Sequence, residues 1–129
     1  MTDPLSESLR IQSEASSRGF DWPDVRGVLD KIEEELNEIR EALDRQDVAH
    51  GRRELGDLML AAVNAARFLD TDPGEELKRA TRRFQARFQA LDSELVREGK
   101  RMESCSLSEL DAIWSRVKVR ADKALEEGA

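Results

Sequence analysis

The sequence predicts an all-α fold, a bundle of about four to five helices. Three observations lead to this prediction. Apolar residues recur at helical spacing, no segment alternates apolar and polar residues as a strand would, and the composition combines 38% charged residues with only three prolines. A chain of 129 residues has about the length of one domain. We therefore expect a single domain over residues 1–129.

The first two helices are expected over residues 5–18 and 24–45. The segment GFDWPD separates them, and its Pro23 suits a first helical turn. The apolar residues of the second segment are spaced 3, 4, 3, 4, which is typical of a buried helix seam. They are Leu29, Ile32, Leu36, Ile39 and Leu43.

The remaining helices are expected over residues 51–70, from Asp72 to about 98, and from Ser106 through Leu125. A polar turn over residues 44–51 precedes the third helix, whose expected inner side is rich in leucine and alanine. Asp72 and Pro73 fit the N-cap and first position of the fourth helix, while Ser106 and Glu109 have capping-box spacing. The inner residues of the third helix are Leu55, Leu58, Ala62, Ala65, Ala66 and Leu69.

The charge balance limits the classes of partner. Acidic residues outnumber Lys plus Arg by 28 to 21, for a formal net charge of -7, which argues against a nucleic-acid partner. No apolar run approaches the roughly 18 residues of a membrane span, and the first residues do not resemble a signal peptide. The single cysteine suits a reducing compartment. We therefore expect a cytoplasmic protein without a membrane partner.

Two acidic pairs mark a candidate metal site. Glu35 and Glu38 in the second helix, and Glu54 and Asp57 in the third, are each spaced i, i+3 and precede seam residues. Short-linked helices pack antiparallel, so four carboxylates can converge, with Glu34 as a fifth. Such a cluster is unfavourable without cations, and Mg²⁺ prefers oxygen ligands. The competing interpretation is a solvated acidic face, since acidic pairs are common in a chain this acidic.

Other catalytic centres lack support in the sequence. His50 is the only histidine and falls in a predicted turn, where a surface residue is the simpler interpretation. The carboxylate–histidine pattern of di-iron bundles, nucleophilic triads and phosphate-binding glycine loops are therefore not indicated.

The pattern EExxE at residues 34–38 followed by ExxD at residues 54–57 resembles the all-α nucleoside triphosphate pyrophosphohydrolases of the MazG family. Further segments that look like the C-terminal catalytic half of MazG proteins extend the resemblance over about residues 10–120. They are GFDWPDVRGVLDKIEEELNEI, ELGDLMLAAVNAARFL, RRFQARF and LDAIWSRVK.

The resemblance implies Mg²⁺-dependent hydrolysis of nucleoside triphosphates to the monophosphate and pyrophosphate, with Mn²⁺ as a substitute ion. Glu35, Glu38, Glu54 and Asp57 would hold the metal, and Glu34 would bind a further ion or orient the attacking water. Glu34, Glu35 and Glu38 are thus the candidate catalytic residues. The candidate substrate-binding residues are Asn64, Lys78, Arg83, Arg87, Trp114 and Lys118. A homodimer with two active sites is also implied, and the apolar residues on more than one helix face agree with it.

Three interpretations stay open at this point. The first is a hydrolase that removes abnormal or excess nucleotides. The second keeps the chemistry but restricts the substrate to one pyrimidine deoxynucleotide or to phosphoribosyl-ATP. The third is a non-enzymatic helical dimerisation module whose acidic residues are only surface charge.

Overall fold

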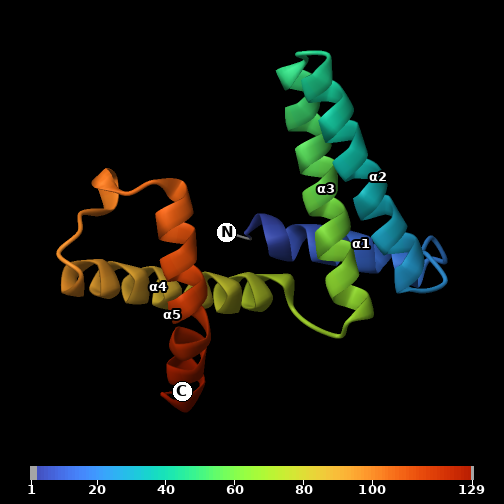
Figure 1. The fold of residues 1–129 in the computed structure, drawn as a ribbon. Coiled ribbons are helices and arrows are strands. Elements are labelled where there is room, and N and C mark those ends of the chain that lie inside the picture. Colours follow the sequence, from blue (N-terminus) through green and yellow to red (C-terminus); the bar gives the residue numbers. More distant parts are fainter. Residues whose placement is uncertain (1–2, 129) are drawn as a thin grey trace. The chain divides into compact units, whose positions relative to one another are not determined.

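The computed structural model describes residues 3–128 and confirms the all-α prediction, with no strand among these residues. Five α-helices follow one another, with a short 3₁₀ helix, η1, before the last (Figure 1). Their bounds are α1 Pro4–Ser17, α2 Val25–Asp44, α3 Val48–Phe68, α4 Pro73–Arg97, η1 Met102–Ser104 and α5 Leu107–Glu127. None of the helices in this range is long and apolar enough to cross a membrane.

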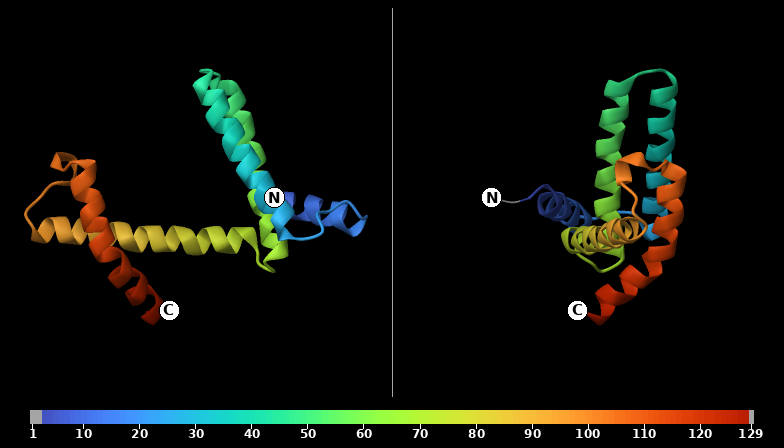
Figure 2. Two further views of the ribbon diagram at one scale, coloured as in Figure 1. Left: turned by 45° about the vertical axis from the view of Figure 1, so that its right-hand side comes forward. Right: turned by 60° about the vertical axis from the view of Figure 1, so that its left-hand side comes forward.

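The helices form two compact units, Met1–Glu76 and Leu77–Ala129. In the first unit α2 and α3 run side by side, as both views of Figure 2 show, and α1 packs against α3. In the second unit α5 packs on the C-terminal half of α4 through Leu91, Leu95, Ile113 and Val117. The prediction that the whole chain is one catalytic domain stays a prediction.

The helix ends follow the expected capping chemistry. Asp24 accepts a hydrogen bond from the backbone N–H of Arg26 at the start of α2, and Asp72 accepts one from Glu75 at the start of α4. The capping box of Ser106 and Glu109 is present at the start of α5. The capped helices therefore begin close to where the sequence places them.

The predicted turn over residues 44–51 is wrong in its second half. Asp47 caps α3 by accepting a hydrogen bond from the backbone N–H of His50, so the helix already begins at Val48. His50 consequently lies on a helix rather than in a turn. Its Nε2 atom is 3.4 Å from a carboxylate oxygen of Glu54.

The predicted seam of α2 is also wrong in part. Leu29, Leu36 and Leu43 are exposed, while Val28, Glu35 and Ala42 are buried. On α3 the exposed residues likewise include Leu55 and Ala62, and its C-cap Leu69 is exposed too; the buried ones are Gly51, Glu54, Ala61, Val63, Ala65 and Ala66. Small side chains let the two helices approach closely, so the interface uses the stripe next to the leucines. This shift of one residue turns Glu35 and Glu54 inward.

Candidate active site

Three carboxylates meet between α2 and α3. One oxygen from each of Glu35, Glu38 and Glu54 lies within 4.8 Å of the other two. Glu35 and Glu54 are among the few buried charged residues in residues 3–128, with exposed fractions of 3% and 7%. The predicted convergence of the two helices' carboxylates is therefore found for these three residues.

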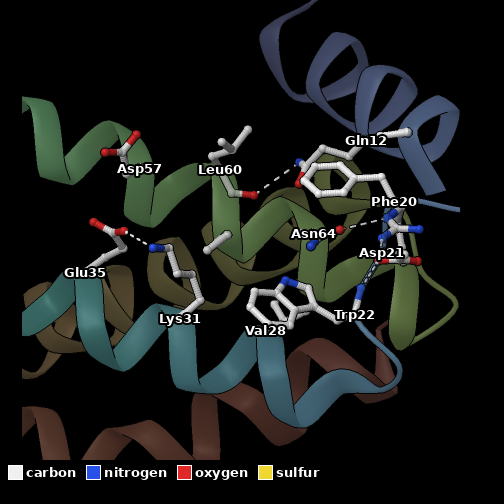
Figure 3. A pocket seen from close by; sticks show the side chains of 13 residues that line it. Gln12, Phe20, Asp21, Trp22, Val28, Lys31, Glu35, Asp57, Leu60 and Asn64 are labelled. Atoms are coloured by element: carbon white, nitrogen blue, oxygen red, sulfur yellow. Dashed lines mark hydrogen bonds and ion pairs between the residues drawn. The ribbon is translucent and has the colours of Figure 1, made fainter. Parts of the chain in front are cut away.

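The fourth predicted ligand, Asp57, lies outside this trio. It is exposed, but it lines a cavity that Glu35 also lines (Figure 3). Glu34 is exposed too, and its carboxylate lies 3.4 Å from Nζ of Lys31. Both residues are thus near the cluster without being part of it.

The carboxylates perturb one another's proton affinity. The neighbouring carboxyl groups of Glu35 and Glu38, together with burial, raise the pKa of Glu54 to about 8. The pKa of Glu35 is lowered, first by its hydrogen bond with the Glu54 carboxyl and then by Lys31, whose Nζ lies 3.1 Å from Glu35 Oε1. When no cation neutralises the cluster, its carboxyl groups therefore hold a proton more tightly than an isolated glutamate does.

The residues present fit a hard divalent cation. Glu35 Oε2 is buried and has no hydrogen-bond partner within the described chain. An unpaired buried carboxylate oxygen is costly, and the donor set around it consists of oxygens, which Mg²⁺ prefers. An ion held by Glu35, Glu38 and Glu54 would satisfy this oxygen and replace the proton.

A cavity of about 630 Å³ lies beside the cluster, within the first unit. Its walls are partly apolar, formed by residues of α1, α2, α3 and the segment between α1 and α2 (Figure 3). The polar residues lining it include Lys31, Glu35, Asp57, Asn64 and Arg67. The cavity thus combines carboxylates, cations and an apolar wall that suits a flat ring.

Local chain geometry places two aromatic residues on this cavity. At the end of α1, Gly19 has a φ of 94° and the backbone N–H of Phe20 bonds to the carbonyl of Ala15. This turn brings Phe20 and Trp22 to the cavity wall. A Cβ built on Gly27 would lie 2.6 Å from the Trp22 ring, so the indole occupies the space that a larger side chain at position 27 would need.

Asn64 is the one predicted substrate-binding residue on this cavity. It is half-buried on α3, and its Oδ1 accepts a hydrogen bond from Arg67 Nε at 2.8 Å. Arg67 also pairs with Asp21 at 2.6 Å. The sequence offers a hint of the Asn64–Arg67 contact in the i, i+3 spacing, but none of the contact with Asp21, 46 residues away.

The other predicted substrate-binding residues belong to the second unit. Arg87 forms a two-pronged ion pair with Asp122, at 2.7 and 2.6 Å. Trp114 packs against the Phe84 ring, with centroids 5.5 Å apart, and Lys118 and Arg83 are exposed on their helices. Lys78 is also exposed on α4. The roles of these five residues in phosphate and base contact stay predictions.

Sequence reasoning overlooked several cavity residues, namely Asp21, Trp22, Lys31 and Arg67. Lys31 could have been found, because it precedes Glu35 by one helical turn. Arg67 could likewise have been found, because it follows Asn64 by one helical turn. Asp21 and Trp22 reach the cavity only because the chain folds back after α1.

Comparison with known proteins adds independent findings. Residues 17–95 match the family described as the MazG nucleotide pyrophosphohydrolase domain. The chain is 42% identical over 114 residues to a Thermotoga maritima protein named nucleoside triphosphate pyrophosphohydrolase/pyrophosphatase MazG. It is 33% identical over 118 residues to the nucleoside triphosphate pyrophosphohydrolase of Escherichia coli K12. Each match covers 88% of this chain but 44% of the relative, so the chain spans less than half the length of these proteins.

Proposed function

Because the chain belongs to the MazG family of nucleotide pyrophosphohydrolases, we propose that it hydrolyses nucleoside triphosphates to the nucleoside monophosphate and pyrophosphate. The observation that carries this proposal is the cluster of Glu35, Glu38 and Glu54 beside the 630 Å³ cavity. A nucleotide needs a place for both its phosphates and its base. The carboxylates can hold the cations that phosphates require, and the apolar wall can receive the base.

The metal of the proposal is Mg²⁺, with Mn²⁺ as a substitute, held by Glu35, Glu38, Glu54 and Asp57. When bound there, it would neutralise phosphate charge and make a water molecule more acidic. The chain's own groups have separate tasks. Glu34, exposed and next to the cluster, would orient the water or bind a further ion, while Lys31 offsets negative charge on Glu35. Lys78, Arg83, Arg87 and Lys118 would contact phosphates, and Trp114 would stack on the base.

The wider role of the proposed enzyme is the removal of abnormal or excess nucleotides in the cytoplasm. It acts as a homodimer and needs no nucleic-acid partner. Exposed leucines on α2 support the dimer, because monomeric proteins rarely leave a large apolar patch uncovered. They are Leu29, Leu36 and Leu43.

The test is a panel of canonical and modified ribo- and deoxynucleoside triphosphates incubated with Mg²⁺ and analysed by chromatography. We expect monophosphate and pyrophosphate, and no product when the metal is chelated. Diphosphate and inorganic phosphate would contradict cleavage between the α and β phosphates. Absence of any product across the panel would favour the non-enzymatic dimerisation module. Turnover of only one pyrimidine deoxynucleotide, or of phosphoribosyl-ATP, would narrow the substrate.

A further inference from the structure

A chain of polar contacts fixes the amide of Asn64. Arg67 Nε donates to Asn64 Oδ1 at 2.8 Å, and Arg67 Nη2 donates to Asp21 Oδ1 at 2.6 Å. Asp21 is itself fixed, since its Oδ2 accepts from Ser16 Oγ at 2.6 Å and its Oδ1 from the backbone N–H of Trp22 at 2.8 Å. The orientation of Asn64 thus depends on residues from the end of α1 and the segment after it.

This arrangement determines which amide atom of Asn64 faces the cavity. A guanidinium group can only donate hydrogen bonds, so the atom that contacts Arg67 must be the carbonyl oxygen. Turning the amide over would set its NH₂ group against the guanidinium, donor to donor. The Asn64 nitrogen therefore lies on the side away from Arg67, as Figure 3 shows, and no partner of Nδ2 occurs within residues 3–128.

The Arg67–Asp21 pair is well placed to hold this orientation. The two side chains are only 15% and 21% exposed, and Arg67 makes one contact on each side through different nitrogens. Charge-assisted hydrogen bonds are stronger than neutral ones, and partial burial limits competition from water. Asn64 is thereby restricted to the role of donor.

The position of Asn64 along α3 indicates what it would touch. Seven residues, or about 10 Å of helix, separate it from Asp57. Both residues line the same cavity, with Trp22, Val28 and Ala61 on the apolar wall. With phosphates bound at the carboxylate end, a nucleoside that continued along the cavity would bring its ring to that wall, beside Asn64.

We propose that Asn64 is a fixed hydrogen-bond donor to the nucleobase, with Arg67 and Asp21 as its positioning residues. The inference rests on the proposed function and names its substrate class. The site selects bases that present a carbonyl at this edge, as guanine, hypoxanthine, uracil and thymine do. Adenine and cytosine present an amino group there. That amino group is itself a donor, so it would face the NH₂ group of Asn64 and both would remain unpaired.

The experiment compares two matched substrate pairs, dITP with dATP and dUTP with dCTP. Within each pair the bases differ in a carbonyl against an amino group, together with the proton on the adjacent ring nitrogen. We expect kcat/KM to favour the carbonyl member about tenfold or more, because a site built to donate leaves the amino group unsatisfied. In Arg67→Met the amide can turn over, and the ratio should fall to about twofold or less. Asn64→Asp, which replaces the donor by an acceptor, should reverse the preference.

The ratio of kcat/KM for the carbonyl substrate to kcat/KM for the amino substrate separates positioning from a general structural effect. Damage to the fold lowers kcat/KM for both substrates of a pair and leaves their ratio unchanged. Arg10→Met, a matched change at an exposed arginine of α1, should leave the ratio at the parent value. A ratio near one in the parent protein would overturn the assigned selectivity. A parent-like ratio in Arg67→Met would overturn the role of Arg67.

A binding measurement makes the inference independent of turnover. Titration calorimetry with dIMP and dAMP needs no hydrolysis, so it still decides if the proposed function fails. Tighter binding of dIMP, lost in Arg67→Met, would support the fixed donor. Equal affinities, or no binding of either monophosphate at millimolar concentration, would contradict it.

Discussion

Glu38 is the residue that best separates metal chemistry from structural charge. It belongs to the carboxylate trio but is less buried than Glu35. Glu38→Gln keeps the shape and removes one negative charge, so without metal the variant should be as stable as the parent or slightly more so. It should lose most of the Mg²⁺-induced rise in Tm, since a ligand stabilises only by binding the folded state. Activity should fall at least about a hundredfold, roughly 3 kcal/mol.

The matched control is Glu41→Gln, at an exposed glutamate one turn further along α2. We expect its melting curve with and without Mg²⁺, and its rate, to follow the parent. Similar behaviour of the two variants would mean that α2 carries only a solvated acidic face.

Asp21 predicts a pH dependence of stability. Its hydrogen bond with Arg67 lowers its pKa from 3.8 to about 2. Because the pKa is lower in the folded state, the ionised carboxylate stabilises the fold above the unfolded pKa, and this contribution is lost as the pH falls towards 2. The Tm of the parent should therefore decline more steeply between about pH 4 and pH 2 than that of Asp21→Asn. Thermal unfolding of the parent and of Asp21→Asn at a series of pH values measures this difference in slope.

Asp30→Asn, at an exposed carboxylate of α2, provides the comparison. It should retain the parent's acid slope. Parallel slopes for the parent and Asp21→Asn would show that the pair adds no acid-sensitive stability.

At the residue scale, the sequence allowed the cluster of three carboxylates to be predicted but not its surroundings. Glu35, Glu38 and Glu54 stand in a motif with helical spacing, so their convergence follows from the antiparallel packing of two neighbouring helices. The Asp21–Arg67 contact joins residues 46 positions apart and depends on the turn at Gly19. No local pattern predicts such a contact.

At the scale of elements, the helices and their caps were predictable and the buried faces were not. The helical spacing of apolar residues and the capping residues together define where a helix begins and ends. Which face α2 buries depends on the helix packed against it. Two adjacent stripes of α2 are apolar enough to form that buried face. The helices bury the stripe containing Val28 and Ala42, which permits close approach, and leave Leu29 and Leu43 outside.

The contact between Gly27 and Trp22 gives a prediction for α2. Alanine favours a helix over glycine by about 1 kcal/mol, but the methyl group at position 27 would overlap the indole and displace Trp22 from the cavity wall. The overlap offsets the helical gain, so the Tm of Gly27→Ala should not exceed that of the parent. We expect a higher KM for triphosphates and a changed tryptophan fluorescence.

Gly51→Ala is the control for this substitution. Gly51 also lies in a helix, but its added Cβ would meet Leu43 at an ordinary 3.7 Å. It should gain stability with kinetics unchanged. If Gly27→Ala shows the same behaviour, Trp22 does not contribute to nucleotide binding.

At the scale of the whole molecule, the main prediction is a homodimer with two-fold symmetry. The chain mass is 14.6 kDa, so light scattering should give twice this value at micromolar concentration. The predicted association would bury the exposed leucines of α2, so the Tm should rise with protein concentration. A monomer that retains full activity would contradict this prediction.

The Asp21–Arg67 pair also has a consequence for how this chain can evolve. A lineage that replaces one partner leaves the other as a partly buried charge without its counter-ion, which costs stability. The first of two substitutions is therefore disfavoured even when the final pair would be acceptable. Descendants should keep both residues or exchange both, together with the amide at position 64. A change of base preference would then arrive as a linked set of substitutions, crossing a less fit intermediate, rather than by gradual drift.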